Sequence, residues 1–348
     1  MFGSARRATA PNAAVAMTGR RQFHLVMIKP THYDDDGYPI QWLRSAIPSN
    51  TLACLNGLAE DARSRNVLGE DVDICLHTFD ETNLRIRPER IIKMIRDSGG
   101  TALIALVGVQ SNQFPRAVDL AAPFLDAKLP VCIGGFHVSG CLSMLPELPA
   151  DIRAAQARGI SLFAGEAEEG RFDIVLRDAH EGNLKPLYDF MDKLPNLRGE
   201  PPPILPRKHV TRTSGSLSSI DLGRGCPYQC SFCTIINVQG RKSRGRSADD
   251  VERTINEHWE HGVRHFLLTD DNFARNKDWE AIFDRIIEMR ERDKPKIRLI
   301  IQVDTLCHKI PNFIEKASQS GVRRVFIGLE NINPDNLIAA QKLSLIHI

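Results

Sequence analysis

The chain of 348 residues has no long apolar run and almost no net charge. No apolar stretch reaches the roughly 18 residues that a membrane-spanning helix requires, so we expect no membrane span. The formal net charge of +2 argues neither for nor against nucleic acid. Nucleic acid is not an expected partner, because no RNA-binding domain is recognisable. Hydrophobic residues make up 42% and charged residues 25%, as in ordinary globular proteins, and the length allows two domains.

Cysteine is too scarce for a disulfide scaffold. The chain has eight cysteines, and three of them share one short segment. Four others, Cys54, Cys75, Cys132 and Cys141, lie in or near apolar runs. This usage suits the reducing interior of a cell, so we predict a cytoplasmic protein.

The three grouped cysteines, Cys226, Cys230 and Cys233, have the spacing Cys-x3-Cys-x2-Cys. They follow residues 217–222, whose alternation predicts a strand, and the glycines of Gly223–Gly225 allow a sharp turn. Three thiolates on one tight loop can converge on one small inorganic group. A four-iron, four-sulfur cluster normally takes four cysteine ligands, so three leave one iron open to a substrate or cofactor.

Two other interpretations of the three cysteines remain open. A structural zinc site usually takes four ligands as two Cys-x2-Cys-like pairs, and no second pair follows here. Cys307 is isolated. His258, His261 and His265 lie too far along the chain to complete a site on the same loop. The second alternative is three free or buried cysteines, although three in one glycine-rich turn are rarely accidental.

With Phe232 directly before the last cysteine, this loop resembles the signature of the radical SAM superfamily. The resemblance implies that Cys226, Cys230 and Cys233 hold a [4Fe-4S] cluster, and that its open iron binds S-adenosylmethionine near Phe232. It also implies that one electron, from an external donor, cleaves S-adenosylmethionine to a 5′-deoxyadenosyl radical. The cofactor supplies the difficult chemistry, and the protein positions it and excludes water and oxygen.

Residues 23–185 alternate continuous apolar strands with amphipathic helices. This pattern predicts an α/β fold with a Rossmann-like, doubly wound parallel sheet. Ligands of such sheets bind beyond the carboxyl ends of the strands. Three segments at predicted strand ends are therefore candidate binding loops, namely residues 29–39, 108–114 and 134–137.

The segments Gly134–His137 and 163–168 resemble the cobalamin-binding domain that precedes many radical SAM domains. The paired glycines allow a flat group to approach the backbone closely. The resemblance implies that four residues of this domain contact cobalamin. These are Gly134, Gly135, His137 and Ser111.

One departure from that resemblance concerns the cobalt ligand. Proteins that bind cobalt through a histidine carry the motif Asp-x-His-x-x-Gly. Around His32, Pro30 and Asp35 stand in place of the aspartate and the glycine. We therefore do not expect His32 to ligate cobalt. The domain then binds cobalamin without a protein ligand or binds nothing.

The remaining segments complete the predicted domain organisation. Residues 1–22 lack acidic residues and predict a disordered tail, with a transit peptide as the alternative. Residues 186–216 contain six prolines and predict an extended linker. Residues 217–342 predict four strands of an incomplete (β/α) barrel. Because the radical SAM family's partial barrel has six strands, we expect a truncated domain, and a non-native tail over residues 343–348.

Polar residues follow the predicted strands of this second domain. By resemblance, Asp270 and Asp271 lie near the methionyl amine of S-adenosylmethionine, where a carboxylate can pair with an ammonium group. The alternative is that they cap a helix. Further candidate contacts to the same cofactor are Gln302, which the next strand supplies, and Glu330, at the end of the strand after it. No catalytic residue is assigned.

A basic segment follows the cysteines and consists of Arg241, Lys242, Arg244 and Arg246. It is interpreted as local architecture that also contacts an anionic substrate.

The predicted function is that of a radical SAM enzyme with a [4Fe-4S] cluster, S-adenosylmethionine and cobalamin as cofactors. A cobalamin-dependent C-methyltransferase is one form of this prediction, and the substrate is unknown. One alternative is an enzyme that methylates or methylthiolates RNA, which the basic segment favours and the lack of a recognisable RNA-binding domain opposes. The other is a non-catalytic cobalamin sensor.

Overall fold

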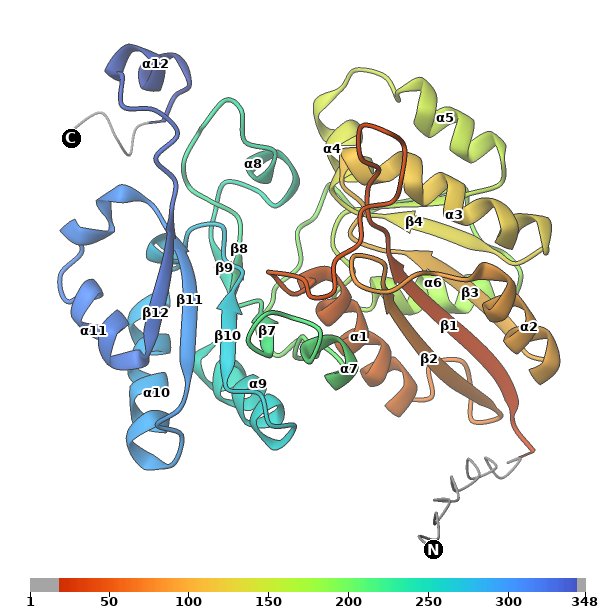
Figure 1. Cartoon of the computed structure of the whole chain (residues 1–348), viewed down its shortest axis with the longest axis horizontal. Helices are drawn as coiled ribbons and strands as arrows, with labels where there is room; N and C mark the ends of the chain where they lie inside the picture. Colours follow the sequence, from red (N-terminus) through yellow and green to blue (C-terminus); the bar gives the residue numbers. More distant parts are fainter. Residues whose placement is uncertain (1–18, 343–348) are drawn as a thin grey trace, which may run out of the picture.

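The apolar runs of the first half form a six-stranded parallel sheet in this computed structural model, which describes residues 19–342 (Figure 1). The strand order is β2-β1-β3-β4-β5-β6, so the chain winds outward from β1 in both directions. The strands are β1 (Arg21–Lys29), β2 (Val72–Asp80), β3 (Thr101–Leu106), β4 (Val131–Gly134), β5 (Ser161–Ala164) and β6 (Leu187–Asp189).

Helices cover both faces of this first sheet. On one face Leu25 and Met27 of β1 pack in a cluster with residues of α1 and α6, and on the other Val26 and Ile28 pack with residues of α2 and α3. Because both faces are covered, β1 is apolar without alternation. The helices are α1 (Asn50–Ser64), α2 (Pro88–Ser98), α3 (Phe114–Asp126), α4 (Phe136–Met144), α5 (Ala150–Ala157) and α6 (Arg171–His180), with a 3-10 turn η1 (Ser111–Gln113) before α3.

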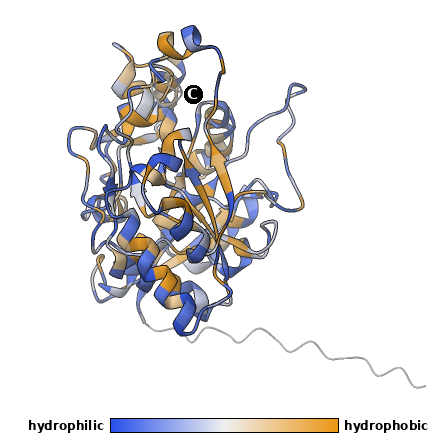
Figure 2. Cartoon of the chain, turned by 90° about the vertical axis from the view of Figure 1, so that its left-hand side faces the viewer, coloured by the Kyte–Doolittle hydropathy of each residue, from blue (hydrophilic) through white to orange (hydrophobic). Residues whose placement is uncertain are grey.

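The second half forms a four-stranded parallel sheet in the order β12-β11-β10-β7. A two-stranded antiparallel pair, β8 and β9, lies beside it (Figure 1). Figure 2 shows apolar strands at the centre and helices of mixed polarity around them. The strands are β7 (Leu217–Ile220), β8 (Gly223–Arg224), β9 (Arg244–Gly245), β10 (His265–Leu268), β11 (Arg298–Val303) and β12 (Val322–Ile327).

The helices of the second half follow the sequence signals for helix starts and ends. Ser247 accepts a hydrogen bond from the backbone of Asp250, and the Asp250 side chain returns a bond to the Ser247 backbone, a capping box that starts α9. The helices are α8 (Ile235–Val238), α9 (Ala248–Glu260), α10 (Trp279–Arg292), α11 (Phe313–Ser320) and α12 (Pro334–Ala339), with 3-10 turns η2 (Phe273–Arg275) and η3 (Thr305–Lys309). No helix in residues 19–342 is long and apolar enough to cross a membrane.

Two predictions about local structure were wrong. The proline-rich segment 186–216 is not simply extended, because Leu187–Asp189 pairs with β5 and Arg207–Val210 forms a helical turn, α7. Gly134–His137 is not a loop throughout, because α4 begins at Phe136. The predicted tail over residues 1–22 overlaps β1, which starts at Arg21. The rest of that tail, and residues 343–348, lie outside the described residues.

Candidate active site

The cysteine loop leaves β8 at a turn that only glycine fits well. Gly225 has a φ of 84°, and a Cβ there would lie 2.5 Å from the carbonyl oxygen of Lys242. The loop is closed by a hydrogen bond from the Cys226 backbone to the carbonyl of Gly240, 3.2 Å away. A second bond, from the Cys233 backbone to the carbonyl of Cys230, tightens its far end at 3.1 Å. The sequence thus brings the three thiols onto one rigid turn.

None of the three cysteines is in a disulfide. Burial raises the pKa of both the Cys226 and the Cys230 thiols, and the neighbouring thiols raise it further. Within residues 19–342, no three His, Cys, Asp or Glu side chains are arranged to hold a single metal ion. A tetrahedral zinc ion would need sulfurs about 3.8 Å apart, from Zn–S bonds of about 2.3 Å. The three thiols therefore do not form a compact single-ion site.

Two carboxylates follow β10 and lie against this loop. Asp271 accepts a hydrogen bond from the backbone N–H of Gly225 at 3.2 Å, which links the two segments directly. Burial raises the pKa of Asp271 to about 6. Asp270 is buried, one of its carboxylate oxygens accepts from Asn276 at 2.8 Å, and the other has no partner. Burial raises the pKa of Asp270 well above its usual value.

A polar network that the sequence did not reveal joins the cysteine loop to β11. Asp304 accepts two hydrogen bonds from Arg275, at 2.7 and 2.9 Å, and one from Asn272 at 2.9 Å. The hydroxyl of Tyr228, between the first two cysteines, reaches the same carboxylate at 3.4 Å. Burial alone would raise the pKa of Asp304, but the bonds from Arg275 and Asn272 hold it below its usual value.

The other predicted contacts to S-adenosylmethionine lie around this network. Gln302 donates to the carbonyl oxygen of Asp270 at 3.5 Å. Glu330 forms an ion pair with Lys342 at 2.5 Å, and its φ is 49°. Phe232 is exposed, with the Lys342 ammonium group 5.9 Å from its ring centre. The structure thus brings together Asp270, Asp271 and Gln302. Lys342 lies between the other two, because it contacts both Phe232 and Glu330.

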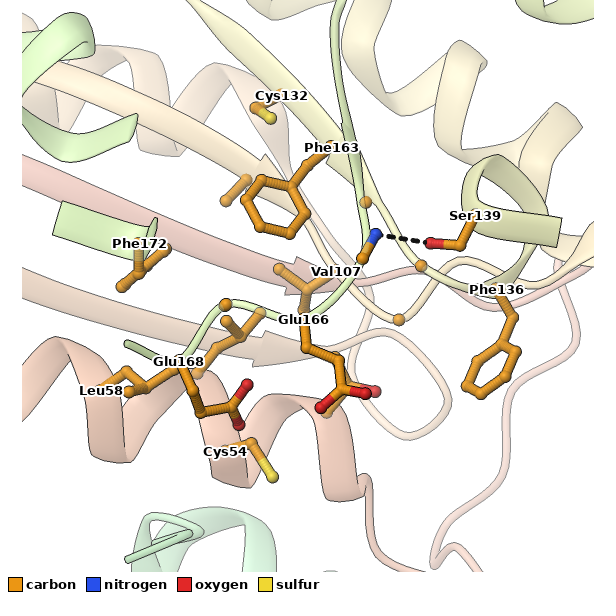
Figure 3. Close-up of a pocket in the computed structure, with 18 of the residues that line it drawn as sticks. Cys54, Leu58, Val107, Cys132, Phe136, Ser139, Phe163, Glu166, Glu168 and Phe172 are labelled. Atoms are coloured by element: carbon orange, nitrogen blue, oxygen red, sulfur yellow. Dashed lines mark hydrogen bonds between the residues drawn. The ribbon is translucent and has the colours of Figure 1, made fainter. Parts of the chain in front are cut away.

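A cavity lies at the carboxyl ends of β3, β4 and β5 (Figure 3). Its empty volume, counted to its open mouth, is about 1020 Å³. Phe163 stands over it from the end of β5, and the carboxylates of Glu166 and Glu168 extend toward Cys54 on α1 (Figure 3). No histidine is among its lining residues. Val238 and Gln239, just after the cysteine loop, close its far side.

The structure separates the four residues predicted to contact cobalamin. Gly134 and Gly135 line the cavity, but a Cβ on Gly135 would lie 2.2 Å from the backbone nitrogen of Val109, so this glycine is required by the protein's own packing. Ser111 and His137 contact each other at 3.2 Å and do not line the cavity. Ser139, which was not among the predicted residues, lines the cavity instead and accepts a hydrogen bond from the Gly165 backbone at 3.0 Å.

Arg224 joins the two sheets at the floor of this cavity. It is buried and pairs with Asp221, Glu166 and Glu168 at 2.6, 2.6 and 2.5 Å. Burial would lower the pKa of Arg224, but the three carboxylates raise it, so the guanidinium stays charged. The charge of Arg224 likewise holds the pKa of Glu168 below its usual value, against the effect of burial.

Two residues of the basic segment belong to the same group of contacts between the two sheets, which we call the seam. This corrects the prediction that these two residues contact an anionic substrate. Arg244 pairs with Glu166 and donates to the carbonyl of Pro195 at 2.7 Å. Arg246 is fully buried and donates to the backbone carbonyls of Asp221 and Glu200, each at 2.8 Å. Both guanidinium groups are thus engaged in contacts within the protein.

Comparison with known families decides the class of the second half. Residues 220–344 match the family model described as "Radical SAM superfamily". Residues 220–344 therefore form a radical SAM domain. The radical SAM match begins at the end of β7 and includes the cysteine loop, the carboxylates after β10, and β11 and β12.

Curated relatives of this chain are named as methylases or methyltransferases. It is 24% identical over 276 residues to the hopanoid C-2 methylase of Rhodopseudomonas palustris, covering 77% of this chain and 49% of the relative. It is 26% identical over 254 residues to the bacteriochlorophyllide d C-8(2)-methyltransferase of Chlorobaculum tepidum, covering 68% and 52%. The chain thus spans about half the length of these curated relatives.

Solved structures show a similar fold. The radical S-adenosylmethionine methyltransferase TsrM of Kitasatospora setae, with tryptophan and a SAM analogue bound, matches with a TM-score of 0.61 and 16% identity. The match covers 90% of this chain and 60% of TsrM. TsrM with cobalamin and a [4Fe-4S] cluster bound gives a TM-score of 0.60, covering 91% and 60%. This likeness supports the α/β arrangement of two parallel sheets.

Proposed function

We propose that this chain is the cofactor-binding part of a radical SAM methyltransferase that transfers a methyl group to a carbon atom with the help of cobalamin. The observation that carries the proposal is the adjacency of two sites. Gly240, whose carbonyl accepts from the Cys226 backbone, directly follows Gln239 of the cavity wall. A group in the cavity and a group on the cysteine loop would therefore be close neighbours.

The cysteine loop suits an iron–sulfur cluster better than a single ion. It offers three free thiols on one turn, which is the donor set of a cluster with one open iron. When bound, the reduced cluster supplies the electron for cleavage of S-adenosylmethionine. Asp271 is placed to attract the ammonium group of that cofactor once it is ionised, and its bond to Gly225 keeps it against the loop.

The cavity suits a mostly apolar group, because its walls carry Leu58, Val107 and Phe163. Cobalamin would be held here by shape, without a histidine ligand to cobalt, because no lining residue is a histidine. When bound, cobalamin carries the methyl group. Glu166 and Glu168 are occupied by Arg224 and hold the cavity floor closed.

The named relatives favour a small, largely apolar substrate over RNA. Two of them are named for hopanoid and bacteriochlorophyllide substrates. Two of the four basic residues that favoured an RNA substrate, Arg244 and Arg246, are buried in contacts within the protein. A non-catalytic cobalamin sensor remains the second candidate, since a cavity without catalysis would meet that role.

The proposal is tested by anaerobic reconstitution of the chain with iron and sulfide. We expect about four iron atoms per chain, and reductive cleavage of S-adenosylmethionine to 5′-deoxyadenosine or transfer of its methyl group to added cobalamin. A chain that binds cobalamin but neither iron nor S-adenosylmethionine would support the sensor. A chain that takes up zinc and no iron would overturn the proposal.

A further inference from the structure

The connection between β1 and α1 exposes three large apolar side chains together. Trp42 is 63% exposed, Leu43 is 93% exposed and Ile47 is 52% exposed. They flank Ser45 and Pro48, which are buried and anchor the segment. The sequence places apolar residues here without a hydrophobic partner in the described chain, which costs solubility and calls for a reason.

Backbone hydrogen bonds hold this segment in place. The N–H of Trp42 donates to the carbonyl of Thr82 at 2.7 Å, and the N–H of Ser45 donates to the carbonyl of Arg212 at 3.0 Å. Ser214 donates back to the carbonyl of Ser45 at 2.9 Å. The segment therefore lies between the β2–α2 turn and the residues after α7, in front of the two sheets (Figure 1).

Basic side chains surround the same segment. The neighbouring turns supply five exposed cations and the segment itself supplies Arg44, and none of the six is among the ion pairs of residues 19–342. Arg212 donates to the carbonyl of Asn83, and Lys208 lies 5.5 Å from the ring centre of Phe79, so both neighbouring turns join one surface. We name this surface the basic–apolar patch, comprising Trp42, Leu43, Ile47, Arg44, Arg85, Arg87, Arg207, Lys208 and Arg212.

The acidic residues of the same connection lie on a separate arm. Asp34, Asp35 and Asp36 belong to a hairpin closed by pairing of Tyr33 with Pro39. The Tyr33 hydroxyl donates to Asp119 on α3 at 2.6 Å, which holds that hairpin against the first sheet. The patch thus keeps a strong local positive charge in a chain whose net charge is only +2.

We propose that the basic–apolar patch docks the protein on the surface of an anionic lipid bilayer. Tryptophan is enriched at the membrane–water interface, and neighbouring aliphatic side chains can enter the boundary of the headgroups and acyl chains. Arginine and lysine next to them attract anionic lipids. Leu43 and Ile47 offer nothing to a phosphate or a stacked base, so the combination favours lipid over nucleic acid. This inference does not depend on the proposed catalytic function.

The test is sedimentation of the whole chain with lipid vesicles. We expect binding to phosphatidylcholine vesicles that contain phosphatidylglycerol, little binding to phosphatidylcholine alone, and weakening by salt. Two triple variants should each bind the anionic vesicles at least about tenfold more weakly than the parent. One is Trp42→Ser, Leu43→Ser, Ile47→Ser, and the other is Arg44→Gln, Arg207→Gln, Lys208→Gln. Two matched triple variants on other surfaces should bind as the parent does. The apolar control is Leu329→Ser, Ile332→Ser, Ile338→Ser, and the basic control is Arg96→Gln, Lys128→Gln, Arg158→Gln.

Trp42 offers a second measurement that does not depend on the variants folding. Trp42 is much more exposed than the chain's other two tryptophans, Trp259 and Trp279, which are partly buried against the core. Its fluorescence should shift to the blue on anionic vesicles and be quenched by brominated lipid. Absence of binding, equal binding to neutral vesicles, or equal loss in the controls would overturn the proposal. Displacement of the protein from vesicles by single-stranded RNA at equal phosphate would assign the patch to nucleic acid instead.

Discussion

The carboxyl edges of the two parallel sheets carry different kinds of side chain. The edge of the first sheet is a cavity walled by aliphatic and aromatic side chains, whose only carboxylates are already paired with Arg224. The edge of the second sheet carries three thiols, the carboxylates of Asp270 and Asp271, and the Asp304 network. One edge is suited to select a ligand by shape, and the other by charge and metal–sulfur bonds.

The two sheets also differ in how they bury similar sequences. β1 and β12 are both rich in apolar residues, yet Met27 in β1 is 0% exposed and Phe326 in β12 is 49% exposed. β1 has a neighbour on each side, whereas β12 is the outer strand of its sheet in the described residues. An apolar run therefore predicts a strand, and the position of that strand in the sheet decides how much each residue stabilises the fold.

The largest effect on stability is expected at the seam that joins the two edges. Arg224→Met should lower the free energy of unfolding by about 3–5 kcal/mol, because it leaves Asp221 and Glu168 as buried, uncompensated charges and Glu166 with Arg244 alone. The measurement is urea denaturation. The control is Arg253→Met, which should cost no more than about 1 kcal/mol, because the Arg253 side chain is half-exposed and Asp250 keeps its bonds from the backbones of Gly199 and Ser247. Equal, small losses in both variants would show that the seam is not an energetic link.

The contrast between inner and outer strands predicts a smaller pair of effects. Met27→Ala should cost about 2–5 kcal/mol, because it removes a fully buried side chain from a closed core. Phe326→Ala should cost less than about 1 kcal/mol, because half of that side chain is already in water. Both are measured in the same denaturation experiment. A loss at Phe326 as large as that at Met27 would mean that β12 is covered in solution.

The charged edge predicts a dependence on pH that the apolar edge does not share. Because burial raises the pKa of Asp271 to about 6, above its value in the unfolded chain, its contribution to stability is present at low pH and is lost as the pH rises through 6. As the pH rises through 6, Asp271→Asn should therefore lose less thermal stability than the parent. The control is Asp192→Asn, at a carboxyl outside both sites. An unchanged slope for Asp271→Asn would remove Asp271 as the titrating group.

Much of the fold follows from local sequence signals. Pro88 and Gly99 bound α2, since proline fits the first turn and Gly99 adopts a φ of 66° after the last. The alternation of strands and helices that the sequence predicts is present in both halves. The spacing of the three cysteines identified the superfamily, because that signal is contained in eight consecutive residues.

The remainder depends on contacts between distant segments. Arg224 lies 58 residues after Glu166, and nothing in either segment marks them as partners. The three-residue strand β6 exists because β5 offers it an edge, although its surroundings are rich in proline. Ser139 lines the cavity and Ser111 does not, and sequence position alone does not tell which side chain faces a cavity that three strands form together.

The most direct test of two distinct neighbouring sites is to measure iron and cobalamin per chain in matched variants after reconstitution. Cys230→Ala should lose most of its iron and keep its cobalamin, because Cys230 is a thiol of the loop and not of the cavity wall. Leu55→Trp, which fills the cavity from α1, should bind cobalamin about tenfold more weakly or worse and keep its iron. Leu55→Met is the control and should keep both. Loss of both cofactors together in each variant, or cobalamin bound as tightly by Leu55→Trp as by the parent, would contradict this account.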